Sequence, residues 1–60
     1  MNDKIRKALE NAGHDTSDVG RRIYNAPDSG DAVKDLKNAE KRLTETVRTI
    51  QDVTKILEEG

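Results

Sequence analysis

The sequence predicts an all-α protein with two short N-terminal helices, paired as a hairpin, and one long C-terminal helix. The long helix follows from four large aliphatic residues that recur at intervals of seven: Leu36, Leu43, Ile50 and Leu57. They lie in residues 29–59, a stretch with no proline and one glycine near its start. Earlier apolar residues also recur at helical spacing, and Gly13 and Pro27 divide that part of the chain into two segments. Together these segments predict a bundle-like arrangement of three helices that oligomerises through the long one.

The first helix is expected over about residues 3–12. Its inward side is formed by residues at helical spacing: Ile5, Ala8, Leu9 and Ala12. Asn2 or Asp3 can cap its N-terminus, and Gly13 is a typical C-terminal stop.

The second helix is expected over about residues 16–26. Its start offers three capping side chains: Asp15, Thr16 and Ser17. Val19 and Ile23 point inward, and Pro27 ends the helix. Gly20 costs about 1 kcal/mol relative to alanine, so this helix is the weakest of the three.

A turn over residues 27–30 leads into the long helix, expected over about residues 30–59. Asp28 or Ser29 can cap it, and Asp31 in its first turn favours the helix dipole. A helix of about 30 residues is about 45 Å long, whereas each short helix spans only about 15 Å. The short helices therefore leave the distal half of the long helix uncovered.

The uncovered stripe is the predicted partner or oligomer interface, and it consists of Leu43, Val47, Ile50, Val53, Ile56 and Leu57. A parallel two-stranded zipper is disfavoured, because it would place Asp35 against Glu40 and would fill its second core position with small and polar residues. The width of the stripe favours an antiparallel homodimer or a higher helical oligomer. Two alternatives remain open: a monomer that binds a different helical protein, and a monomer whose short helices cover the stripe.

Composition places the chain in a narrow class. Residues 1–60 can form only one small domain, and with no cysteine it has neither a disulfide nor a thiolate metal site. The 11 basic and 12 acidic residues give a formal charge of −1, so no general attraction to nucleic acid or anionic lipid is expected. No apolar run approaches a membrane span or a signal-peptide core, so a soluble cytoplasmic protein with no membrane partner is expected.

A second function class comes from residues 12–25. Ala12 and Gly13, followed by Ser17 and Val19, resemble the turn and recognition helix of helix-turn-helix DNA-binding proteins. The resemblance implies a small dimeric regulator whose second helix contacts DNA through Ser17, Arg21, Arg22 and Asn25. Acidic residues nearly balance the basic ones over residues 3–26, which makes this the alternative and not the preferred function.

Catalytic, metal-binding and cofactor-binding residues are not expected. His14 is the only histidine, and its acidic neighbours Asp15 and Asp18 are typical of a helix start. No glycine-rich phosphate loop and no nucleophile with a base at a recognisable spacing is present. Basic residues along the long helix, such as Lys34 and Arg48, have acidic residues three positions away and indicate a solvated face. The sequence therefore predicts a non-enzymatic protein-protein interaction or assembly module.

Overall fold

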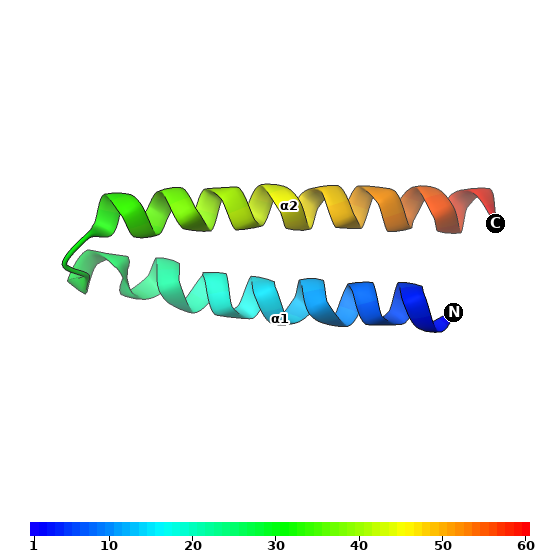
Figure 1. The fold of residues 1–60 in the computed structure, drawn as a ribbon, viewed down its shortest axis with the longest axis horizontal. Helices are drawn as coiled ribbons and strands as arrows, with labels where there is room; N and C mark the ends of the chain where they lie inside the picture. The colour runs from blue at the N-terminus through cyan, green and yellow to red at the C-terminus, as the bar shows by residue number, and fades with distance from the viewer.

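Two antiparallel helices form the protein in the computed structural model, which describes all of residues 1–60 (Figure 1). Helix α1 spans Asp3–Asn25, a single turn of 3-10 helix, η1, spans Ala26–Asp28, and helix α2 spans Ala32–Glu59. The helices lie side by side, with the C-terminal end of α2 extending beyond α1, and the molecule measures 46 × 15 × 12 Å between its Cα extremes. Both chain ends lie at the end of the hairpin opposite η1. The chain is therefore all-helical, as the sequence predicts.

The prediction of three helices is wrong, because the two expected short helices are one continuous helix. Residues 13–16 are helical, and Gly13 has no positive φ that would end the helix. Thr16 does not cap a new helix: its hydroxyl donates to the carbonyl oxygen of Ala12 at 2.7 Å. A series of residues at spacings of alternately four and three runs through Gly13 without a shift, from Ile5 to Ala26, and Thr16 is its only polar member. A break would turn the second half of this seam away from α2, and packing against α2 outweighs the weak helix propensity of glycine.

The N-terminal cap of α1 is Asn2, one of the two residues expected to cap it. The side-chain oxygen of Asn2 accepts a hydrogen bond from the backbone N–H of Ile5 at 2.9 Å. This satisfies one of the N–H groups that the first turn leaves without a partner.

The chain reverses over η1 and the residues that follow it, with Pro27 in the first turn of η1. The cap of α2 is Asp31 and neither Asp28 nor Ser29, because the Asp31 carboxylate accepts from the backbone N–H of Lys34 at 3.2 Å. Ser29 instead lies just before the helix and forms hydrogen bonds with residues at its start. Its hydroxyl oxygen accepts from the backbone N–H of Asp31 at 3.1 Å, and its hydroxyl donates to the Asp35 carboxylate. The expected turn therefore forms, and the cap of the helix that follows it lies two or three residues later than expected.

The core between the helices is thin and made of small side chains. Its four buried residues are Val19, Ala26, Ala39 and Val53. Val19 is the most enclosed, at 1% exposure. The middle of the α2 seam is polar, and Thr46 donates its hydroxyl back to the Arg42 carbonyl oxygen at 3.0 Å. Two helices with such a seam bury few large aliphatic residues, so most of these remain partly exposed.

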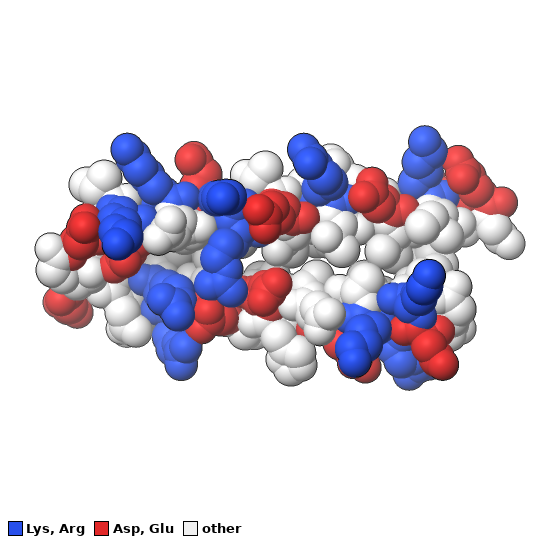
Figure 2. Space-filling model, viewed as in Figure 1, with Lys and Arg blue, Asp and Glu red and all other residues white.

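Charged side chains cover the outer surfaces of both helices. Acidic and basic residues are interspersed along the face in view, and neither sign forms a continuous area (Figure 2). This agrees with the nearly balanced composition. Neither α1 nor α2 combines the length and the apolar content that crossing a membrane requires.

Candidate interaction surface

An apolar face runs along α2 on one side of the seam with α1. Its residues follow one another at spacings of seven, four, three and seven: Leu36, Leu43, Val47, Ile50 and Leu57. Leu43 is half-buried, and each of the other four exposes about half of its surface, from 47% at Leu36 to 51% at Val47. One side of each of these residues thus meets the hairpin and the other meets water.

Helix α1 extends the same face across the seam. Ile23 joins Leu36, Leu43 and Val47 in one shallow groove, together with Ala39, Glu40 and Thr44. A second groove continues toward the chain ends and is lined by Leu9, Ala12, Gly13, Thr16, Thr46 and Ile50. The two grooves lie on the same side of the seam. Together with Leu57, which continues the row of α2 residues beyond them, they are called the apolar face below.

Four of the six predicted interface residues lie on the apolar face: Leu43, Val47, Ile50 and Leu57. Val53 does not, because it is 7% exposed and packs between the helices. Ile56 does not either: it lies fourteen residues after Arg42, at the opposite edge of the seam, although it is 52% exposed. The expectation that only the distal half of the long helix stays open is wrong, because the 23-residue α1 runs beside almost all of α2.

Sequence reasoning missed Leu9, Ile23 and Leu36 as surface residues. Leu36 carries the first position of the seven-residue repeat, but it was assigned to the part covered by the short helices. Leu9 and Ile23 belong to the unbroken spacing of α1 that passes through Gly13. Both were expected to point inward from two separate short helices, whereas the spacing read across Gly13 places them on one edge of a single helix.

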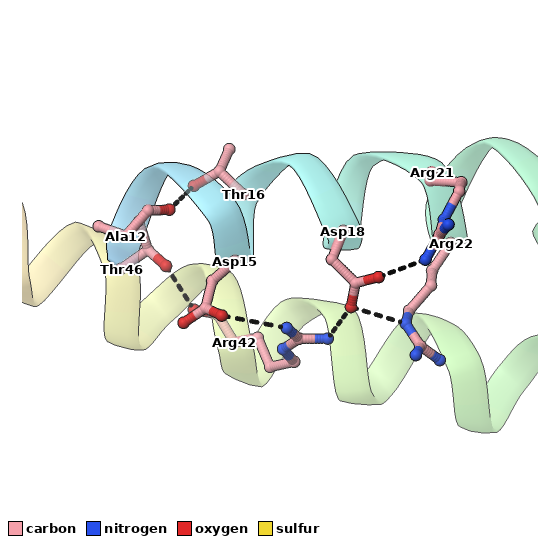
Figure 3. A network of polar contacts seen from close by, with 8 residues as sticks. All are labelled: Ala12, Asp15, Thr16, Asp18, Arg21, Arg22, Arg42 and Thr46. Atoms are coloured by element: carbon pink, nitrogen blue, oxygen red, sulfur yellow. Dashed lines mark hydrogen bonds and ion pairs between the residues drawn. The ribbon is translucent and has the colours of Figure 1, made fainter. Parts of the chain in front are cut away.

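The opposite edge of the seam is ionic (Figure 3). Arg42 reaches from α2 toward α1, where its guanidinium contacts the Asp18 carboxylate at 2.9 Å and the Asp15 carboxylate at 3.5 Å. Asp18 also accepts from Arg21 at 2.6 Å and from Arg22 at 3.0 Å, both on its own helix. One carboxylate thus receives three guanidinium groups, and only the Arg42 contact joins the two helices.

The surrounding guanidinium groups perturb the titration of this cluster. Hydrogen bonds from Arg42, then Arg22 and Arg21, lower the pKa of Asp18 far below its ordinary value of 3.8. The Asp18 carboxylate in turn raises the pKa of Arg42. The network keeps one edge of the hairpin charged and hydrated, so the two edges differ sharply in chemistry.

The residues of the DNA-binding alternative all lie on α1. Ser17, Arg21, Arg22 and Asn25 are exposed, but no turn precedes them, since residues 13–16 are helical. Arg21 and Arg22 share the Asp18 carboxylate, which offsets part of their positive charge. DNA binding through these residues stays a prediction, without the two-helix turn on which the resemblance depends.

The arrangement offers apolar contact and little else. His14 is exposed on α1, and no group of three or more histidine, cysteine or carboxylate side chains is placed to hold a metal ion. The groove on the ionic edge is lined by charged and amide side chains around Ala39, among them Arg22, Asp35 and Glu45. The apolar face is therefore the feature from which a function can be argued. No protein-family model, no curated protein and no solved structure matches this chain.

Proposed function

We propose that this protein is a non-enzymatic assembly module that binds another helical surface through its apolar face. That other surface belongs either to a second copy of the chain or to a different helical protein. The observation that carries the proposal is the continuity of that face over both helices, with Leu36, Val47, Ile50 and Leu57 each about half exposed. Apolar areas of this kind, bordered by charged residues, mark association surfaces.

The energy of such an association can be judged from the exposed fractions. Fully burying an aliphatic side chain contributes about 1.5–3 kcal/mol, so covering the exposed half of one aliphatic side chain of the apolar face contributes about 1 kcal/mol. The aliphatic residues of the face then supply on the order of 5 kcal/mol from each copy, against which the loss of translational and rotational freedom must be set. The ionic edge supplies less, because exposed ion pairs contribute about 0–1 kcal/mol each.

A pair of matched substitutions tests this proposal. Ile50 and Ile56 are the same residue type, lie on the same helix and are exposed to 49% and 52%. Ile50→Asp places a charge in the apolar face, whereas Ile56→Asp places it at the ionic edge. We expect Ile50→Asp to abolish association, measured by sedimentation equilibrium for self-association, and Ile56→Asp to retain it.

The same pair serves if the partner is a different protein. The probe is then a fluorescent synthetic amphipathic helix with leucine at its heptad core positions, titrated into each variant and followed by anisotropy. Binding by the parent and by Ile56→Asp, but not by Ile50→Asp, is the expected result. Equal behaviour of the two variants in both assays would rule out the apolar face as the site of association.

A further inference from the structure

The exposed area of the hairpin is much larger than a chain of this mass normally leaves in water. Folded monomers of 6.7 kDa expose about 3,900 Å², whereas this chain exposes 5037 Å². The excess is about 1,100 Å². A specific interface buries about 800 Å² on each partner, so contact with one further hairpin of the same size covers most of the excess.

The open side of α2 is nearly symmetric about Val47. Leu43 lies four residues before it and Ile50 three residues after it, and Leu36 and Leu57 lie at about equal distances further out. Reversing the helix about Val47 therefore superimposes aliphatic residues on aliphatic residues. A two-fold axis perpendicular to α2 at this point would pair Leu36 with Leu57 of a second copy, and Leu43 with its Ile50.

One pair of oppositely charged residues at the rim is related by the same symmetry. Lys37 and Glu58 lie on the edge of the apolar face that is remote from α1, at about equal distances from Val47. Both are exposed, and neither takes part in the ion pairs of this structure, which involve only the Asp15, Asp18 and Arg42 cluster with its two neighbouring arginines. The reversed copy brings its Glu58 to Lys37, whereas in a parallel pair Lys37 and the Glu58 of the other copy are 21 residues, about 30 Å, apart along the helix.

Helix α1 carries small residues at the level of the proposed two-fold axis. Ala12 and Gly13 line the same groove as Thr46 and Ile50, so they lie across the seam from Val47. A Cβ atom added at Gly13 or Gly20 would meet nothing within 4 Å, so the hairpin itself does not require glycine there, although each costs about 1 kcal/mol in a helix. Glycines seven residues apart, beside the apolar face, leave room for a close helix of a second copy.

From the area and the symmetry of the rim we infer that the occupant of the apolar face is a second copy of this chain, with α2 antiparallel to its counterpart across a two-fold axis near Val47. The product is a four-helix bundle with its two reversals at opposite ends, of the size and topology that short-looped bundles adopt. This inference rests on the proposed function, because it assigns the partner of the same face.

Cross-linking tests the arrangement directly. The chain has no cysteine, so Lys37→Cys and Glu58→Cys each introduce a single thiol. The two variants are mixed and treated with a short bis-maleimide, and mass spectrometry identifies the linked residues. We expect links between residues 37 and 58 of different copies. In a dimer with both reversals at the same end, these residues are about 30 Å apart along the bundle and would not be linked.

Charge reversal gives an independent readout with the protein at equilibrium. Lys37→Glu alone and Glu58→Lys alone each convert two attractive contacts of the dimer into repulsive ones, and we expect a dissociation constant about tenfold higher, less so at high salt. Mixing the two variants restores opposite charges at both contacts and recovers the parent affinity. Lys41→Glu is the control, because Lys41 lies on the outer side of α2 and its reversal should leave the dissociation constant unchanged.

The outcomes separate this inference from the proposed function. Two results would overturn the antiparallel arrangement while leaving the apolar face as the association site. One is a link between residue 37 of one copy and residue 37 of the other. The other is a dimer that shows no link and does not recover the parent affinity when the two charge-reversed variants are mixed. A parent chain that stays monomeric at all concentrations would overturn the second copy as occupant, and the binding of the amphipathic probe helix would still decide the proposed function.

Discussion

Replacing Ile50 by alanine tests the energetics of the apolar face at its centre. The substitution removes most of the side-chain carbons, which contribute about 2.4 kcal/mol when fully buried, at about 0.8 kcal/mol per carbon. Ile50 is 49% exposed in the hairpin, so about half of this contribution, about 1.2 kcal/mol, is already present in one copy. The other half arises only when the face is covered.

In a symmetric dimer the loss on association occurs twice and amounts to about 2.4 kcal/mol, which raises the dissociation constant about 50-fold. Ile56→Ala removes the same atoms from a residue that is 52% exposed but lies at the ionic edge. It should weaken the hairpin by about 1.2 kcal/mol and leave the dissociation constant unchanged.

Two measurements separate these effects. Sedimentation equilibrium gives the dissociation constant of each variant, and urea unfolding followed by circular dichroism gives the free energy of unfolding. If the hairpin unfolds when the dimer dissociates, both variants lose more stability, but Ile50→Ala still exceeds Ile56→Ala by about 2.4 kcal/mol per dimer. Equal losses in the two variants would refute the assignment of the face.

Three further predictions follow from the seam and its edges. Gly20→Ala should raise the free energy of unfolding of the isolated hairpin by about 1 kcal/mol, because an added Cβ meets nothing within 4 Å. It should also weaken dimerisation, measured by sedimentation, because the added methyl group occupies the room left for a helix of the second copy; stronger dimerisation would argue against a close second helix. Val19→Ala should cost about 2 kcal/mol in urea unfolding, because Val19 is 1% exposed and its loss leaves a cavity; a neutral result would mean that the seam collapses around the site. Asp18→Asn should reduce the loss of stability on acidification from about pH 5 to about pH 2, followed by thermal unfolding. The pKa of Asp18 is lowered in the folded state, so its stabilising contribution is present above its ordinary pKa of 3.8 and is lost as the pH falls below that value; an unchanged acid profile in Asp18→Asn would contradict this account.

Much of the secondary structure was readable from the sequence. The seven-residue repeat beginning at Leu36 identified the long helix, and Pro27 with the polar residues after it identified the reversal. Asn2 was recognised as a possible cap because short polar side chains before an apolar repeat serve that role. These features depend on local spacing and local hydrogen bonding, which sequence patterns report directly.

The continuity of α1 was not readable in the same way. Gly13 with the capping side chains after it is a typical stop signal, and in isolation such a segment would end a helix there. What decides the outcome is the contact with α2: Val19 is buried against it, and Asp15 and Asp18 meet its Arg42. A long-range contact can outweigh about 1 kcal/mol of local propensity at each glycine.

The order of the residues alone shows that the chain is helical, where it reverses, and that its long C-terminal helix carries more apolar surface than one thin seam can bury. Which part of that surface stays open depends on how α1 packs against α2. Val53 turned inward and Ile56 turned to the ionic edge, while Leu9, Ile23 and Leu36 joined the apolar face. The reason is geometric. Spacing along a helix shows which residues share a side of it. The direction from which a second helix approaches is set by packing and by ion pairs between residues distant in sequence, here Arg42 with Asp15 and Asp18.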